Sequence, residues 1–158
     1  MRIIAGEHKG RPIAAPKGQS TRPTGDRARE AVFNLISHAA WAPPIDGARV
    51  IDLFAGSGAL GLEAMSRGTT SIQRRSATDL GPIPAGVGAP FTIAFLDPPY
   101  NKGLAEPALE QLAKGGWLTE DAIAIVETAA DEMLPFAGWD VLDARTYGAA
   151  KVSFLRRA

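Results

Sequence analysis

Long apolar runs alternate with amphipathic segments along most of the 158-residue chain. The runs ARVIDLFAG at 48–56, FTIAFLD at 91–97 and AIAIVET at 122–128 are almost continuously apolar. They predict parallel strands covered on both faces, because a half-exposed strand would alternate apolar and polar residues. The segments at 57–68 and 103–116 predict helices between them. The expected fold class is α/β, with a Rossmann-like, doubly wound and mostly parallel sheet.

The two ends of the chain predict smaller elements. Residues 1–20 hold two short apolar stretches around a turn with Gly and Lys, which favours a small β-hairpin arm. Residues 22–40 predict a helix with Asp26 in its first turn, where a negative charge is favourable. Its apolar face comprises Val32, Leu35, Ile36 and Ala39. The tail at 139–157 predicts an antiparallel hairpin around a Tyr-Gly turn, so we expect the arm and one domain over 21–158.

Composition excludes several classes of protein. The chain has no cysteine, so it can form neither a disulfide framework nor a thiolate metal site. No apolar run approaches the roughly 20 residues of a membrane span, and the opening apolar stretch is too short for a signal peptide. His8 and His38 fall in different segments, which gives little support for a metal site. We therefore expect a soluble, cytoplasmic protein without a bound metal.

Charge is unevenly spread although the net charge is zero. Residues 1–30 hold seven Lys or Arg against three Asp or Glu, and residues 145–158 hold four basic residues and no acid. The middle of the chain, 31–144, has six basic and fourteen acidic residues. Basic ends around an acidic body are able to dock a polyanion such as a nucleic acid. A solvated charge distribution without a partner is the alternative.

A glycine pattern lies where the first strand passes into a helix. Gly56, Gly58 and Gly61 form G-x-G-x-x-G in the context that supports a nucleotide-type cofactor site. The pattern alone does not distinguish a dinucleotide from another adenosine-bearing cofactor. Asp52, four residues before Gly56, would oppose a pyrophosphate but suits a ligand with cationic groups. It therefore favours S-adenosylmethionine, which carries an ammonium and a sulfonium.

The stretch FLDPPY at 95–100 ends the second apolar strand. Asp97 falls at the strand's carboxyl end, where ligands bind in such sheets, and Pro98 and Pro99 offer carbonyls but no N–H. This row of acceptors without donors suits an –NH2 group, such as an exocyclic amine of a nucleobase. Tyr100 adds a flat face on which a base can stack. A proline-terminated strand with a packed tyrosine is the alternative.

With both motifs present, the chain resembles class I S-adenosylmethionine-dependent methyltransferases with a [DN]PP[YF] motif. More closely, it is similar to the RsmD family, bacterial enzymes that methylate the N2 amine of a guanine in 16S ribosomal RNA. The matching segments, in order, are RIIAGEHKGRPI, RPTGDRAREAVFNLI, DLFAGSGALGLEAMSRG, FLDPPYNKG and YGAAKVSFLRR. The resemblance implies a methyltransferase domain over 21–158, S-adenosyl-L-methionine as cofactor, and ribosomal RNA or the small ribosomal subunit as partner of a monomer.

The resemblance also implies roles for single residues. Asp97, Pro98 and Tyr100 would handle the target amine. The cofactor-binding residues would be Thr24, Arg27, Asp52, Phe54, Gly56, Ser57, Gly58 and Ser76. The residues in contact with RNA would be Arg2, Lys9, Arg11 and Arg22. For Arg2, Lys9 and Arg11, plain surface charges are an equal alternative.

One part of the expected fold is missing from the sequence. Such a sheet has a second strand with an acidic residue at its end, about 20 residues past the glycines, to hold the ribose hydroxyls. Between the helix at 57–68 and the strand at 91–97 there is room for one strand only. Roughly thirty residues, forming a strand and a helix with the ribose-binding acid, are therefore expected to be absent near 68–73. A join across an unseen stretch is favoured over a deletion, and it would show as a break in the trace.

Two other functions stay open. A DNA adenine or cytosine amino-methyltransferase would share the chemistry, although no separate target-recognition domain is evident in so short a chain. A non-catalytic RNA-binding or ribosome-assembly protein would keep the fold and lose the cofactor, which the missing segment favours. A nicotinamide oxidoreductase fits less well, because of Asp52 and the DPPY stretch.

Overall fold

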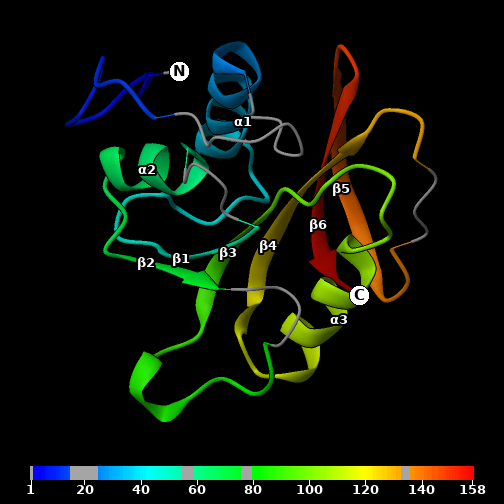
Figure 1. The fold of residues 1–158 in the computed structure, drawn as a ribbon. Helices are drawn as coiled ribbons and strands as arrows, with labels where there is room; N and C mark the ends of the chain where they lie inside the picture. The colour runs from blue at the N-terminus through cyan, green and yellow to red at the C-terminus, as the bar shows by residue number, and fades with distance from the viewer. Residues whose placement is uncertain (1, 15–24, 55–58, 76–79, 133–135) are drawn as a thin grey trace.

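The protein folds around one six-stranded sheet with the strand order β2-β1-β3-β4-β6-β5 (Figure 1). The computed structural model describes residues 2–14, 25–54, 59–75, 80–132 and 136–158. The strands are β1 Arg49–Leu53, β2 Ser71–Arg75, β3 Phe91–Leu96, β4 Leu118–Ala129, β5 Trp139–Tyr147 and β6 Ala150–Arg157. The helices are α1 Asp26–His38, α2 Ala59–Ser66 and α3 Ala105–Lys114, with a short 3-10 turn at Ala85–Val87.

Strand direction divides the sheet into two parts. The first four strands run parallel, with β1 between β2 and β3 and with β3 beside β4. The last two strands are antiparallel and form a hairpin through Tyr147 and Ala150. This confirms the expected mostly parallel sheet with an antiparallel end. β4 begins at Leu118, four residues before the predicted run at 122–128.

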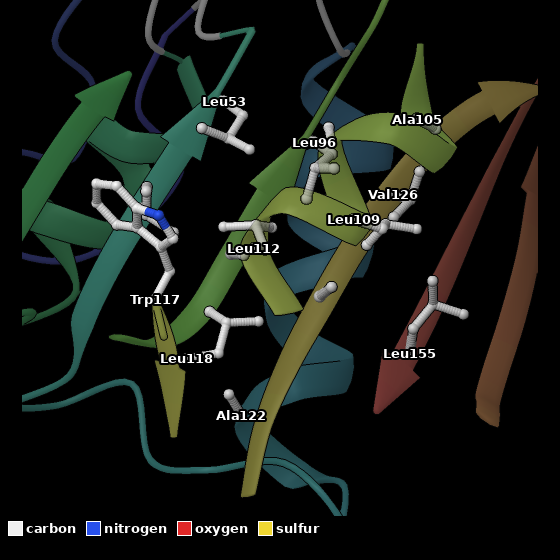
Figure 2. Close-up of a cluster of buried hydrophobic side chains, with 14 of the residues drawn as sticks. Leu53, Leu96, Ala105, Leu109, Leu112, Trp117, Leu118, Ala122, Val126 and Leu155 are labelled. Carbon is white, nitrogen blue, oxygen red and sulfur yellow. The ribbon is translucent and has the colours of Figure 1, made fainter. Parts of the chain in front are cut away.

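The central strands β1 and β3, and β4 from Ala122 onward, are mostly apolar because both faces of the sheet are covered there. One buried cluster joins α3 to the sheet, and Figure 2 shows Leu109 and Leu112 of α3 against the strands. The opposite cluster joins α1 and α2 to the sheet. Within β1 and β3, neighbouring residues alternate between the two clusters. Val50 and Phe95 belong to the α1/α2 cluster, and Ile51 and Leu96 to the α3 cluster.

The N-terminal arm is a small hairpin-like unit. Arg2 and Pro12 form an antiparallel bridge, and the Ile3 amide donates to the Arg11 carbonyl at 2.9 Å. Ile3 and Ile13 are buried together in a small cluster of their own. In Figure 1 this blue segment lies beside α1 and α2. Residues 2–14 therefore agree with the expected arm, and residues 15–24 lie outside the described part of the chain.

The region of the missing segment has no break. After α2 the Thr69 amide donates to Ala64, the Thr70 amide donates to Ala48, and the chain enters β2 directly. The trace through 68–73 is continuous, and the absence of roughly thirty residues there remains a prediction from the sequence. Among the described residues, β2 pairs with β1 alone. On α2, the exposed fraction is 40% for Leu62 and 49% for Met65. Such apolar exposure is expected where a covering segment is absent.

Candidate functional site

Three carboxylates lie at the carboxyl ends of adjacent parallel strands. Asp52 belongs to β1, Asp97 directly follows β3, and Glu127 belongs to β4. The register pairs Leu53 with Leu96, and Leu96 with Val126, so these strand ends are level. By strand alternation all three carboxylates fall on the face covered by α1 and α2. Ligands of open α/β sheets bind at this edge, which makes it the candidate active site.

Asp52 is held against the start of α2. Its side chain is buried, and a Cβ placed on Gly61 would come within 3.1 Å of its Oδ2 atom. A Cβ there would also meet the Ile72 side chain of β2 at 3.5 Å. The third glycine of the motif is therefore explained by close packing of α2 on β1 and β2. Phe54, the residue after β1, has a φ of 59°, which is rare for a residue with a side chain.

The DPPY loop is anchored to the end of β4. Pro98 is buried, Asp97 and Tyr100 are half-buried, and Pro99 is exposed. The Tyr100 hydroxyl donates to Glu127 Oε1 at 2.7 Å. One residue further, the Asn101 amide donates to Glu132 Oε1 at 2.8 Å. Hydrogen bonds to the Glu127 and Glu132 carboxylates thus fix the conformation in which the loop leaves the sheet edge.

The arm is attached to α2 by polar contacts. Glu63 accepts hydrogen bonds from the Ile4 amide at 2.7 Å and the Ala5 amide at 3.1 Å. Ser66 donates to the Ala5 carbonyl at 2.7 Å and accepts from the His8 amide at 2.9 Å. Arg2, Lys9 and Arg11, the expected RNA contacts of the arm, are exposed. The arm therefore presents its basic side chains from a fixed position on the domain.

Several expected site residues fall outside the described chain. They are Arg22, Thr24, Gly56, Ser57, Gly58 and Ser76. Of the expected cofactor residues, Asp52 and Phe54 lie together at the end of β1, and Arg27 is exposed in the first turn of α1. The roles expected for all of these residues remain predictions.

Two groups of residues are not evident from the sequence. Glu127 follows the apolar run 122–126 just as Asp97 follows the run 91–96, and that repeated pattern was the available signal. Arg29 and Glu63, which link α1 to α2, are both fully buried charged residues. Nothing in a single sequence marks them, because charged residues within a helix usually face solvent.

S-adenosylmethionine fits part of this site. A buried carboxylate at the end of β1 and a close-packed helix start suit a cationic ligand. The ribose end lacks its usual partner among the described residues, because β2, Ser71–Arg75, contains no acid. Arg75 ends β2 instead, with its guanidinium 5.7 Å from the ring centre of Trp117. The site therefore fits the methionine end of the cofactor better than the ribose end.

The described residues hold neither a metal cluster nor a membrane-spanning helix. No group of three or more His, Asp or Glu side chains there is arranged to hold a metal ion. No helix in that part of the chain is long and apolar enough to cross a membrane.

A parallel sheet with an antiparallel end hairpin, a glycine-rich sequence after β1 and a DPPY loop after β3 define a Rossmann-like methyltransferase. Solved structures share this fold. The yhhF protein of Escherichia coli has a TM-score of 0.76 and 29% identity, over 99% of this chain and 97% of that one. The rRNA methyltransferase aviRa of Streptomyces viridochromogenes has a TM-score of 0.64 at 13% identity, over 89% and 88% of the two chains, which supports the fold alone.

Sequence comparison identifies the family. The profile of "Conserved hypothetical protein 95" matches residues 1–75 and 69–156. Ribosomal RNA small subunit methyltransferase D of Escherichia coli K12 is 37% identical over 89% of this chain and 82% of its own length. The enzyme of that name from Haemophilus influenzae is 31% identical over 94% and 89%. The chain belongs to this family, the RsmD family.

The same comparisons bear on the missing segment. The family profile matches in two overlapping stretches that meet at β2 rather than in one. The alignment with the Escherichia coli protein spans 167 positions although this chain has 158 residues. That relative therefore holds residues that this chain lacks, which agrees with a loss between α2 and β3.

Proposed function

We propose that this chain catalyses S-adenosylmethionine-dependent methylation of the exocyclic N2 amine of a guanine in small-subunit ribosomal RNA. The observation that carries the proposal is the position of Asp97, which follows β3 level with the end of β1, on the face where Asp52 lies. The relatives named ribosomal RNA small subunit methyltransferase D support ribosomal RNA as the substrate. A cytoplasmic location and a monomeric state belong to the same proposal.

The cofactor would be held at the β1 end of this edge. When bound, S-adenosylmethionine supplies a methyl group activated by its sulfonium charge. Asp52 provides a buried negative charge that suits the cofactor's cationic groups, and Gly61 lets α2 approach the strand closely. The expected contributions of Thr24, Arg27, Phe54, the glycine loop and Ser76 complete the proposed cofactor site.

The target amine would be held at the β3 end. An exocyclic amine is a weak nucleophile because its lone pair is delocalised into the base. Asp97 and the Pro98 carbonyl each accept one amine hydrogen, which directs the nitrogen lone pair towards the methyl group. Most of the acceleration comes from this positioning and from stabilising the positive charge that develops on nitrogen. The Asp97 carboxylate also lies beside the proton that the methylated amine must lose.

The RNA would be held by stacking and by charge. Tyr100 offers its ring to a base taken out of its stack, an interaction of about 1–3 kcal/mol in comparable single-strand sites. Arg2, Lys9 and Arg11 lie exposed on the docked arm and suit phosphate contacts, with Arg22 expected to join them. The arm and the DPPY loop then hold different parts of one RNA.

The test is methyl transfer to ribosomal particles. Protein and its Asp97→Ala variant are incubated with labelled S-adenosylmethionine and unmethylated small subunits or naked 16S RNA, and the labelled base is mapped. We expect N2-methylguanine with the wild type and none with the variant. Asp140→Ala, an exposed aspartate of β5, is the matched control and should retain full activity. Equal labelling by the Asp97 variant would remove Asp97 from the reaction.

A second candidate is an RNA-binding or ribosome-assembly protein that has lost the cofactor. The end of β2 favours it, because Arg75 stands where an acid for the ribose is expected. Calorimetric titration with S-adenosylmethionine separates the two: no detectable binding supports the non-catalytic function. Labelling of DNA but not of ribosomal RNA would instead indicate a DNA amino-methyltransferase.

A further inference from the structure

Glu127 is a buried acid in the mostly apolar second half of β4. It is 7% exposed, and every residue of β4 from Ala122 to Ala129 is buried. Its Oε1 atom accepts the hydrogen bond from the Tyr100 hydroxyl at 2.7 Å. A carboxylate only accepts, so the direction of this bond is fixed. A bond to an ionised acceptor in a buried place is stronger than a neutral one.

The strand register places this contact next to the amine site. Leu96 pairs with Val126, so the residues that follow, Asp97 and Glu127, stand side by side at the ends of β3 and β4. Tyr100 lies three residues after Asp97 and folds back to reach Glu127. The two prolines between them restrict the backbone, so the position of the Tyr100 ring and that of Asp97 are linked through a stiff segment.

The turn after β4 adds a second attachment. Glu132 Oε1 accepts from the Asn101 amide at 2.8 Å and from the Ala129 amide at 3.0 Å. Asn101 has a φ of 58°, in the left-handed region that Asn tolerates better than most residues. The chain therefore turns sharply just after Tyr100, and consecutive residues of the loop are held by Glu127 and Glu132.

We propose that Glu127 is a positioning residue for methyl transfer, acting through Tyr100. This rests on the proposed function, because it concerns the step in which the amine attacks. Glu127 holds the phenol so that the Tyr100 ring keeps one plane, and the stacked base then presents its amine to Asp97. Hydrogen bonding to a carboxylate also makes the ring more electron-rich, which favours the positive charge that develops on the base.

The test is a double-mutant cycle with Glu127→Gln, Tyr100→Phe and the double variant. Glu127→Gln keeps the size of the side chain and removes its charge, and Tyr100→Phe removes only the hydroxyl. We expect each single change to lower kcat about tenfold, equivalent to about 1.4 kcal/mol, with KM for S-adenosylmethionine unchanged. The double variant should be no slower than the slower single variant, because both changes act on the same Tyr100–Glu127 hydrogen bond.

A matched control is available on the same strand. Glu120 is exposed near the start of β4, and Glu120→Gln makes the same chemical change away from Tyr100. It should keep wild-type kcat. Thermal unfolding of all variants separates lost positioning from lost folding, because it shows whether each variant is fully folded at the assay temperature.

A second readout does not depend on activity. The chain has two tyrosines, so in the Tyr147→Phe background the 13C signal of tyrosine Cζ reports on Tyr100 alone. Glu127→Gln should shift this signal and Glu120→Gln should not. No shift, or additive losses of kcat, would overturn the role of Glu127. If the wild type transfers no methyl group to any RNA while Glu127→Gln shifts the signal, the proposed function fails and the contact itself stands.

Discussion

Arg29 of α1 and Glu63 of α2 are both fully buried, and their Nε and Oε1 atoms lie 3.4 Å apart. Arg29 also pairs with Asp26 at 2.8 Å and donates to the Arg2 carbonyl. Glu63 also pairs with Arg67 at 2.9 Å and accepts hydrogen bonds from two amides of the arm. One buried cluster of charges therefore joins the arm to the two helices on the α1/α2 face of the sheet.

Replacing Glu63 with Gln should strongly destabilise the fold. The change removes the only fully buried acid beside Arg29 among the described residues and leaves it with the partly exposed Asp26. Breaking one partner of a buried pair costs about 3–5 kcal/mol. Urea unfolding followed by circular dichroism measures the loss. Glu110→Gln is the control, because Glu110 pairs with Lys114 on the surface and should cost less than about 1 kcal/mol. Equal small losses in both variants would contradict the importance of the cluster.

Asp26 should make stability depend on pH in the acid range. Burial acts to raise its pKa, but hydrogen bonds from Arg29 and the Arg2 amide, with the Arg29 charge, outweigh burial and place the pKa below its usual 3.8. The stabilisation is therefore present above the ordinary pKa and is lost as the pH falls through the lowered one. The side chain is 41% exposed, so the effect should stay below about 1 kcal/mol.

The measurement compares wild type with Asp26→Asn in urea from about pH 7 to about pH 3. We expect the wild type to be more stable at neutral pH and the two curves to converge in acid. Asp140→Asn, exposed on β5, should follow the wild type throughout. A difference in stability that grows as the pH falls would contradict a lowered pKa for Asp26.

Gly6 should be required for docking of the arm. It has a φ of 85°, and a Cβ there would lie 1.9 Å from the Ser66 carbonyl oxygen. Gly10 has almost the same φ, 86°, but nothing lies within 4 Å of its Cβ position. Both Ala variants carry the backbone strain of about 1–2 kcal/mol, and Gly6→Ala alone meets the clash. We expect faster proteolysis of the arm and weaker RNA binding in Gly6→Ala than in Gly10→Ala, with S-adenosylmethionine affinity equal in both.

Gly61 should matter for the cofactor more than for stability. An Ala there favours the helix by about 1 kcal/mol but presses on Asp52 Oδ2 and Ile72. We expect unfolding free energies within about 1 kcal/mol of wild type and about a tenfold weaker affinity for S-adenosylmethionine, measured by calorimetry. Gly86→Ala, with nothing within 4 Å, is the control. Unchanged affinity in Gly61→Ala would remove Asp52 from the proposed cofactor site.

Most elements were predictable because their patterns are local. Continuous apolar runs located β1 and β3, and the Tyr-Gly turn located the β5–β6 hairpin. Phe33 of α1 was not predictable from such a local pattern. It is fully buried, although the predicted apolar face of the helix did not include it. α1 packs on the sheet and is also joined to α2. The buried face of α1 is therefore wider than a single apolar stripe.

The sequence by itself determined the class of fold, the order of its elements and the residues proposed to handle a cofactor and an amine, because backbone geometry and side-chain chemistry are local properties. Only the tertiary structure decided that Glu127 meets Tyr100, that Arg29 meets Glu63, and that the arm is fixed to α2. These contacts join residues 27 to 59 positions apart, and their existence depends on strand register and helix packing. Register and packing arise from the whole sheet, so no single segment encodes them.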